Sequence, residues 1–263
     1  MSIGPLPDAS RDLTRLATHQ VGDIDGVRRF FDELAGRYGE SHGDAARLLR
    51  YRLRLIRRLL DRVQRSCLLE IGCGNGLHLF PLANEFDRVI GTDLSPAMIA
   101  AAEATRAGHP FGGRVSLHAE AAEHLASVPD SSADAVLCVG AFEHMLDQPA
   151  VLNEVARVLK PGGTFVCLTA NGGCIWHTRL APWLGIATRH LSTDRFVSLA
   201  RWRVLLDEAR LSAVRLGAWR FVPAGDMPRW ASLTMQILDR VGSILGASGL
   251  RGGCYVKAVK PRR

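Results

Sequence analysis

Lysine, paired cysteines and long apolar runs are all scarce in this sequence. Only three of the 33 basic residues are lysines, so the net charge of +7 comes from arginine. The six cysteines form no C-x-x-C pair, which argues against a zinc or redox site and favours buried, reduced thiols in a cytoplasmic protein. No apolar run reaches the roughly 18 residues that a membrane-spanning helix needs.

The excess of positive charge raises the question of an anionic partner. Nucleic-acid-binding surfaces often combine basic clusters with aromatic residues, but only 6% of this chain is aromatic and no such interleaving is found. We therefore attribute the arginines to composition and expect no nucleic-acid partner. The first residues, MSIGPLPDASRDLTRL, hold no apolar segment after a basic one, so no secretory signal is expected.

A hydrophobic fraction of 47% is enough for one packed domain. Residues 1–25 lack a sustained periodicity of apolar residues. They are predicted to be a mobile N-terminal arm, before a single domain over residues 26–263. Apolar residues at three- and four-residue spacing predict one helix over 27–38. They predict another over 44–65, with Asp44 as its N-cap.

Short apolar runs alternate with amphipathic ones over residues 67–169. This alternation predicts an α/β fold with a Rossmann-like, mostly parallel sheet and helices on both faces. The expected strands are Cys67–Ile71, Val89–Thr92, Val115–Ala119, Ala135–Val139 and Thr164–Thr169. The expected helices are Leu77–Glu85, Pro96–Ala107, Ala121–Ser127 and Pro149–Val158.

The pattern loosens after residue 170, where 171–191 and 223–249 are predicted insertions that form a helical cap or part of a pocket. The other expected elements are a helix over Ser192–Arg210 with Ser192 or Thr193 as its N-cap, and strands over Ser212–Arg220 and Cys254–Val259. The apolar stripe from Trp230 to Leu245 has three readings, in order of preference: it packs on the sheet, lines a pocket for a lipid-like ligand, or lies on a membrane.

The segment with the most chemical information is LLEIGCGNG, from Leu68 to Gly76. An apolar strand that contains Glu70 leads into three glycines at alternate positions, where backbone can approach a ligand that any side chain would block. A dinucleotide site would need its third glycine at Leu77, and a carboxylate is a poor neighbour for pyrophosphate. The turn therefore fits a cationic ligand better than a nicotinamide dinucleotide.

Two further acids follow strand candidates. Asp93 would reach the same sheet edge as the glycine turn, where its carboxylate can accept two hydrogen bonds from a ribose diol. The alternative is that Asp93 caps the helix that begins near Pro96. Glu120 can accept from an adenine amino group or lie in a solvent-facing loop. The segment LKPGG, from Leu159 to Gly163, predicts a helix stop and a tight turn.

Together these motifs resemble the class I S-adenosylmethionine-dependent methyltransferase family, most of all its branch of quinone-biosynthesis and bacterial small-molecule methyltransferases. The resemblance covers residues 67–169 and rests on EIGCGNG, GTDLSP, AEAAEHL, ADAVL and LKPGG in this order. It implies a seven-stranded sheet whose last strand is antiparallel and lies between the fifth and the sixth. It also implies S-adenosyl-L-methionine as cofactor and S-adenosyl-L-homocysteine as product.

The resemblance also implies a set of cofactor-binding residues. Glu70, Gly72, Cys73, Gly74, Asn75 and Gly76 would hold the methionine end, Asp93 the ribose, Leu94 the adenine face, Glu120 and Ala121 the adenine edge, and Val139 and Gly140 the side next to the methyl group. The implied acceptor is a small, apolar or aromatic, hydroxylated molecule, methylated on oxygen rather than carbon. No stable membrane insertion is expected, peripheral contact stays open, and the oligomeric state is not predicted.

Three histidines are candidates for the base that an acceptor hydroxyl needs. His144 follows the fourth strand candidate, and its alternative role is packing against the next helix. His177 and His190 lie in the irregular stretch, where each has the alternative of an ordinary loop residue. Relatives in the quinone branch use an E-H pair with an acid three positions earlier as a metal site. Here that position is Gly140, so no metal is expected, and a weak site of Glu143, His144 and Asp147 is the alternative. The alternatives to methyl transfer are a cyclase with the same cofactor and a non-catalytic cofactor-binding regulator.

Overall fold

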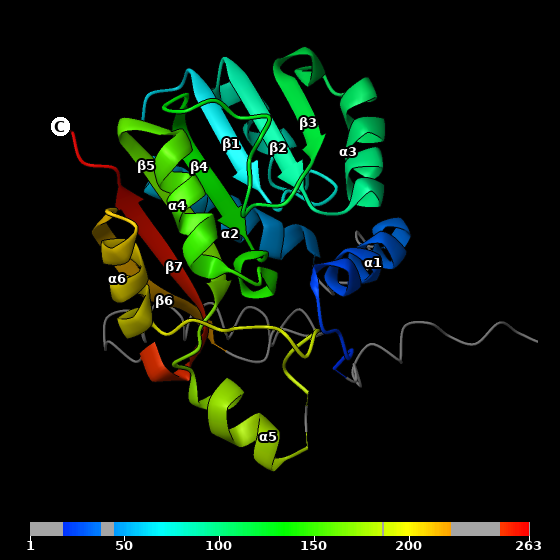
Figure 1. Ribbon diagram of the computed structural model, residues 1–263, viewed down its shortest axis with the longest axis vertical. Helices are drawn as coiled ribbons and strands as arrows, with labels where there is room; N and C mark the ends of the chain where they lie inside the picture. Colours follow the sequence, from blue (N-terminus) through cyan, green and yellow to red (C-terminus); the bar gives the residue numbers. More distant parts are fainter. Residues whose placement is uncertain (1–17, 38–44, 186, 222–247, 263) are drawn as a thin grey trace, which may run out of the picture.

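The computed structural model describes residues 18–37, 45–185, 187–221 and 248–262, drawn in colour in Figure 1. The predicted arm up to residue 17, the Asp44 cap and most of the predicted amphipathic helix in 223–249 lie outside these residues. None of the helices in the described ranges is long and apolar enough to cross a membrane.

Seven strands form one sheet in the order β3-β2-β1-β4-β5-β7-β6 (Figure 1). Their bounds are β1 Cys67–Ile71, β2 Arg88–Asp93, β3 Val115–Ala119, β4 Ala133–Val139, β5 Leu159–Ala170, β6 Ser212–Phe221 and β7 Arg251–Val259. The pairs from β3 to β5 are parallel, whereas β7 runs antiparallel to both β5 and β6. The predicted α/β sheet and the placement of its last strand are confirmed.

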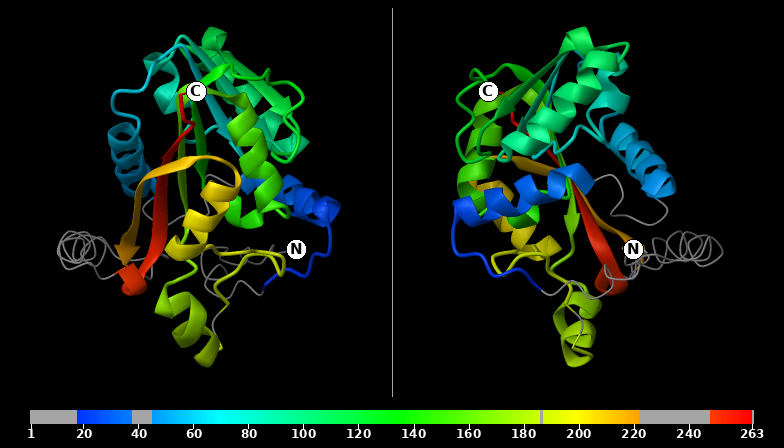
Figure 2. Two further views of the ribbon diagram at one scale, coloured as in Figure 1. Left: turned by 60° about the vertical axis from the view of Figure 1, so that its left-hand side comes forward. Right: turned by 90° about the vertical axis from the view of Figure 1, so that its right-hand side faces the viewer.

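Helices cover both faces of this sheet (Figures 1 and 2). Their bounds are α1 Ile24–Leu34, α2 Ala45–Leu59, α3 Pro96–Gly108, α4 Gln148–Val158, α5 Ala181–Trp183 and α6 Leu199–Glu208. On one face α4 and α6 bury Val151 and Trp202, and on the other α2 buries Leu53 and Ile56. The cysteines are free and buried, as their apolar surroundings predicted.

Two segments that were predicted to be α-helices are not α-helical. The segment 121–127 forms turns, because the carboxylate of Glu120 accepts hydrogen bonds from the backbone nitrogen and the hydroxyl of Ser127 and closes a loop. The segment 77–85 holds only a 3-10 helix over Phe80–Glu85. In both places local hydrogen bonds outweigh the apolar spacing that suggested an α-helix.

Three element ends also differ from the prediction. The second helix ends at Leu59, before Arg62 takes a left-handed backbone with φ 63°. The later helix, α6, begins only at Leu199 and is capped by Ser198, whose hydroxyl accepts from the backbone of Arg201 at 3.2 Å. Neither proposed cap, Ser192 or Thr193, lies at its start. The turn at LKPGG lies inside β5, where the register with β4 jumps between Ala133 and Ala135.

The acid of the ADAVL motif holds the centre of the sheet together. Asp134 accepts from the backbone nitrogen of Cys67 in β1 and from Nζ of Lys160 in β5, each at 2.8 Å. Burial opposes the charged form, but these hydrogen bonds outweigh it and lower the pKa of Asp134. The motif is therefore structural.

The chain before α1 is tied to the loop before α6. His19 and residues 190 and 192 exchange backbone hydrogen bonds of 2.9 Å, and the hydroxyl of Ser192 accepts from the backbone of Val21 at 2.9 Å. The described part of the predicted arm is thus bound to the domain, and mobility stays a prediction for residues 1–17.

Candidate functional site

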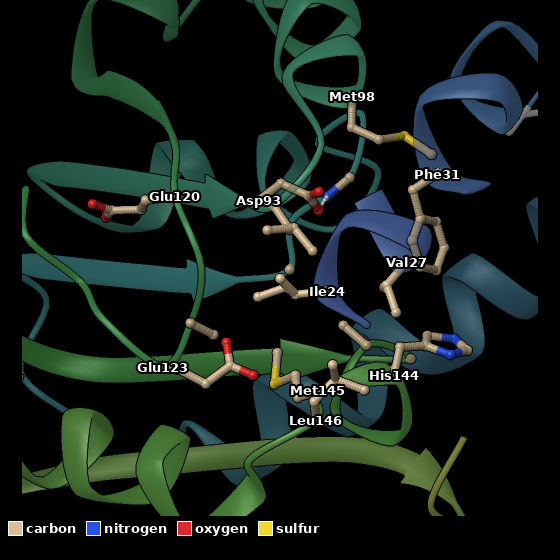
Figure 3. Close-up of a pocket in the computed structure, with 16 residues that line it drawn as sticks. Ile24, Val27, Phe31, Asp93, Met98, Glu120, Glu123, His144, Met145 and Leu146 are labelled. Carbon is tan, nitrogen blue, oxygen red and sulfur yellow. Dashed lines mark hydrogen bonds between the residues drawn. The ribbon is translucent and has the colours of Figure 1, made fainter. Parts of the chain in front are cut away.

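One pocket lies where β1, β2 and β4 end, and residues of α1 line it (Figure 3). Ligands of parallel α/β sheets bind at this carboxyl edge, near the point where the strand order reverses. Here that point falls between β1 and β4, because the chain crosses from β3 at one edge of the sheet to β4 on the other side of β1. The topology therefore creates the pocket before any side chain is considered.

The glycine turn after β1 forms one wall. Gly72, Gly74 and Gly76 have left-handed φ angles of 64°, 54° and 83°, which glycine adopts without strain. A Cβ atom on Gly72 would overlap that of Ala141, so the turn also needs glycine for packing. Gly72 and Gly74 line the pocket. Three other predicted cofactor residues, Cys73, Asn75 and Gly76, belong to the turn but not to the lining.

Glu70 lies beneath this turn and is fully buried. Within the described residues neither of its carboxylate oxygens has a hydrogen-bond partner, and Nδ1 of His78 lies 3.8 Å from Oε1. Burial, and then the charge of Asp93, raise the pKa of Glu70 well above its usual range. A carboxylate left in this state would be stabilised by a cation close to the turn.

Asp93, at the end of β2, lines the pocket next to Leu94. Its Oδ2 accepts from the backbone of Gly74 at 2.8 Å, and its Oδ1 accepts from the backbone of Ser95 at 2.9 Å. The N-cap of α3 is Ser95, so the alternative prediction that Asp93 caps this helix is wrong. Each carboxylate oxygen keeps a further lone pair for a ligand. Burial raises the pKa of Asp93 despite these two bonds.

The loop after β3 contributes Glu120, Ala122 and Glu123 to the pocket, whereas Ala121 is not among the lining residues. Figure 3 shows the carboxylate of Glu120 directed away from Asp93, toward Ser127, whose hydroxyl it binds at 2.6 Å. The sequence analysis did not single out Glu123. The local sequence offered no way to choose between the two acids.

The loop after β4 forms the opposite wall. Gly140 has φ 66°, and a Cβ atom there would meet open space, so the pocket reaches its backbone. Ala141, Met145 and Leu146 continue this wall. Val139, which was predicted beside the methyl group, is buried in the core and does not line the pocket.

His144 is the one predicted base candidate that lines this pocket. Its Nδ1 lies 2.6 Å from Oδ1 of Asp194, a side chain with no exposed surface. Burial opposes protonation of the ring, but the hydrogen bond to Asp194 and the nearby acids outweigh it and raise the pKa of His144. The sequence analysis missed Asp194, because fifty residues separate it from its partner and no motif marks it.

The other two histidines do not line the pocket. The ring of His190 lies 6.0 Å from that of His144, and its own backbone nitrogen donates to Asp194 at 2.9 Å. His177 lies against Phe196, and its Nε2 is 3.2 Å from the carbonyl oxygen of Gly252. The geometry therefore favours His144 over both.

Helix α1 closes the pocket with apolar side chains, of which the sequence analysis placed Val27 and Phe31 only in a predicted helix and Ile24 in the predicted N-terminal arm. Ile24, Val27 and Phe31 line the pocket, and the Phe31 ring lies 5.1 Å from that of His144 (Figure 3). Asp32 anchors α1 to α3, since its Oδ1 accepts from the hydroxyl of Ser95 at 2.5 Å and from the backbone of Ala97 at 3.2 Å.

The charges around the pocket are acidic. Among its described lining residues Asp93, Glu120 and Glu123 are acids, His144 is the one titratable base, and neither lysine nor arginine occurs. Together with the buried Glu70, this set favours a cationic ligand over a phosphate. No group of three or more histidine, cysteine or acidic side chains in the described residues is arranged to hold a metal ion.

Residues 69–167 match the family model for a methyltransferase domain. The chain is 35% identical over 143 residues to a probable S-adenosylmethionine-dependent methyltransferase of Mycolicibacterium smegmatis, covering 54% of this chain and 52% of that protein. It is 34% identical over 103 residues to a ubiquinone biosynthesis O-methyltransferase of Xanthomonas oryzae, covering 39% of this chain and 42% of that protein. The chain thus spans about half the length of these curated relatives, or less.

Two solved structures share the fold. The [4+2]-cyclase SpnF superimposes with a TM-score of 0.64 at 17% identity, over 94% of this chain and all of that one. Geranyl diphosphate methyltransferase, in complex with geranyl diphosphate and sinefungin, gives a TM-score of 0.64 at 14% identity, over 90% of this chain and 99% of that one. At this identity the likeness concerns the fold alone.

Proposed function

We propose that this chain, whose residues 69–167 match the family model for a methyltransferase domain and which is 35% identical over 143 residues to a probable S-adenosylmethionine-dependent methyltransferase, transfers a methyl group from S-adenosylmethionine to a small, apolar or aromatic, hydroxylated acceptor. The observation that carries the proposal is the pocket itself. It combines an edge lined by acids, without lysine or arginine among the described lining residues, with a histidine beside the apolar side chains of α1. When bound, the cofactor supplies an electrophilic methyl carbon on a sulfonium that becomes neutral once the methyl group has left.

On the cofactor side, we assign the predicted residues by their distance from the pocket. Gly72, Gly74, Asp93, Leu94 and Gly140 would contact the cofactor, since each lines the pocket. Glu70 would act from beneath the turn, where its uncompensated carboxylate favours the cationic end of the ligand.

The other predicted cofactor residues are assigned less direct roles. Cys73, Asn75 and Gly76 would shape the turn. Glu120 would still offer free lone pairs to an adenine amino group, with the neighbouring backbone at Ala121. Val139 would act only by supporting Gly140.

On the acceptor side, His144 would be the base. The imidazole would take the hydroxyl proton while the acceptor oxygen bonds to the methyl carbon and the carbon–sulfur electron pair stays with sulfur. Ile24, Val27 and Phe31 would exclude water and hold an apolar ring. Alignment in a dry pocket is most of what an in-line displacement needs.

The second candidate is cyclisation without net methylation, because a [4+2]-cyclase shares this fold over nearly the whole chain. Methylation on carbon is the corresponding variant, since the geranyl diphosphate C-methyltransferases share the fold as well. The pocket favours oxygen because a carbon nucleophile of the alkene type has no proton for His144 to take as the new bond forms.

Calorimetry followed by product mass tests the proposal. S-adenosylhomocysteine is expected to bind and NAD is not, and a panel of hydroxylated aromatic compounds is expected to include one that gains about 14 daltons with S-adenosylmethionine. Binding of NAD in place of S-adenosylhomocysteine would refute the proposal. A product of unchanged mass would support the cyclase alternative.

A further inference from the structure

We propose that Asp194 is a positioning residue for His144: it holds the imidazole with Nδ1 turned to the carboxylate and leaves Nε2 to accept a proton. The inference rests on the proposed transfer to a hydroxyl oxygen. It adds a residue to that reaction which no motif in the sequence marks, and which lies outside the region that matches the methyltransferase family model.

The contact between the two side chains is short and shielded from water. Nδ1 of His144 lies 2.6 Å from Oδ1 of Asp194. The histidine side chain is 10% exposed and the aspartate side chain 0%. A charge-assisted hydrogen bond in such surroundings is stronger than the same pair on a surface, because water neither competes for the donor nor screens the charge.

The carboxylate of Asp194 is fixed from its other side. Its Oδ2 accepts from the backbone nitrogens of His190 at 2.9 Å and of Leu191 at 3.0 Å. These two bonds close a turn of the chain around the carboxylate and set its plane. The remaining oxygen, Oδ1, is therefore presented to His144 and cannot rotate away without breaking them.

The two loops that carry the pair are also tied to each other. The backbone nitrogen of Arg195 donates to the carbonyl oxygen of Glu143 at 2.8 Å. Nε2 of Gln148, a buried side chain, donates to the carbonyl oxygens of Phe142 and Arg195 at 3.1 and 3.0 Å. Three bonds around the pair thus fix the distance between the loops, so the contact is part of the fold.

This arrangement decides the tautomer of the histidine. A carboxylate can only accept, so Nδ1 must carry the proton, and the lone pair of the neutral ring is then on Nε2. A protonated imidazole would gain from the same carboxylate, which makes the ring a stronger base. The other charged groups near the ring are Glu143 and Asp93, which also favour protonation, and His190, which opposes it.

Nuclear magnetic resonance of the ¹⁵N-labelled full chain tests the inference without an acceptor. In the wild-type protein the His144 ring is expected to be protonated at Nδ1 in its neutral form and to titrate above 6.5. In Asp194→Asn the titration is expected to move down by one unit or more, because the amide carries no charge. A wild-type ring protonated at Nε2, or one that titrates below 6.5, would overturn the proposal even if the variant did not fold.

Ser192→Ala is the matched control, since it removes a contact of the same loop with Val21 and leaves the carboxylate in place. It is expected to leave the His144 titration unchanged. If both variants moved the titration equally, Asp194 would only support the loop, and the proposal would fail.

Calorimetry and kinetics separate this inference from the proposed function. Asp194→Asn should bind S-adenosylhomocysteine within about twofold of wild type, while kcat for an acceptor identified by mass falls by about 100-fold or more and KM changes little. Failure of the wild-type protein to bind S-adenosylhomocysteine would refute the function. Wild-type kcat in Asp194→Asn would refute the inference alone.

Discussion

At the scale of single residues, Asp93 connects the fold to the ligand. Its carboxylate already accepts one backbone hydrogen bond on each oxygen, from Gly74 and Ser95, so it shapes the glycine turn that it faces. The remaining lone pair on each oxygen can accept a hydrogen bond from a ligand with two donors, such as a ribose diol. One side chain therefore has a structural role in the turn and, in the proposed function, a role in binding the ribose.

Asp93→Ala should weaken binding of S-adenosylhomocysteine at least about tenfold, because charge-assisted hydrogen bonds are lost. Titration calorimetry measures the change. Asp87→Ala is the control, since Asp87 is an exposed acid just before the same strand and should bind as wild type. Equal affinity of the folded Asp93→Ala variant and the control would reject the ribose role.

Glu70→Gln should make the unliganded protein more stable at pH 8 and weaken binding of S-adenosylhomocysteine. The raised pKa of Glu70 means that the folded state loses stability as pH rises from about 4.5 through the raised value. The amide removes that loss, so the Tm difference between variant and wild type should grow across this range and vanish near pH 4. A constant difference at all pH values would show that the carboxylate is compensated.

At the scale of elements, α1 closes the pocket, and polar as well as apolar contacts attach it. Asp32 reaches from α1 to the first turn of α3, where it accepts from Ser95 and Ala97. Ser95 donates to Asp93 through its backbone nitrogen and to Asp32 through its hydroxyl, so one residue contacts both the pocket carboxylate and the closing helix. We infer that occupancy of the pocket and docking of α1 are coupled.

Asp32→Ala should loosen α1 at a cost of about 1 kcal/mol, because the hydrogen bonds of Asp32 to Ser95 and Ala97 are lost. Hydrogen exchange of residues 24–34 should become faster, and cofactor affinity should fall by less than in Asp93→Ala. Asp25→Ala, on the exposed side of α1 where it pairs with Arg28, is the matched control. Unchanged exchange in Asp32→Ala would show that apolar contacts alone hold the helix.

The element scale also shows where local patterns mislead. The run 121–127 has helical spacing, but Glu120 and Ser127 close it into a loop. The helix expected from Ser192 begins only at Leu199. The residues before it make long-range hydrogen bonds instead: Asp194 binds His144, and Ser192 binds the chain before α1. Long-range hydrogen bonds of this kind leave no trace in a local pattern.

At the scale of the whole molecule, the pocket joins α1 to the loops after β1, β2, β3 and β4, so a ligand should stabilise the packing of these elements against one another. S-adenosylhomocysteine at 100 times its Kd should stabilise the native state by about 2.7 kcal/mol and raise Tm by about 5–10 °C. Thermal unfolding with a fluorescent probe measures the shift. NAD at the same concentration should leave Tm unchanged, and an equal shift with both compounds would contradict a specific adenosyl sulfonium site.

The sequence by itself determined the sheet, the glycine turn and the acid at the end of β2. These features depend on neighbours along the chain: apolar runs of strand length, turns that only glycine permits, and the rule that parallel strands end at one edge. The fold class, all seven strands and the cofactor edge could therefore be predicted, with boundaries off by a few residues at most of the strands.

Only the tertiary structure decided what faces the cofactor edge. Asp194 meets His144 across fifty residues, Asp32 meets Ser95 across 63, and Glu70 proves to be buried without a hydrogen-bond partner in the described chain. None of these follows from spacing, because each depends on how loops from separate strands pack together. The choice of His144 over His177 and His190 is of the same kind, since only the packed structure shows that His144 lines the pocket and the other two do not.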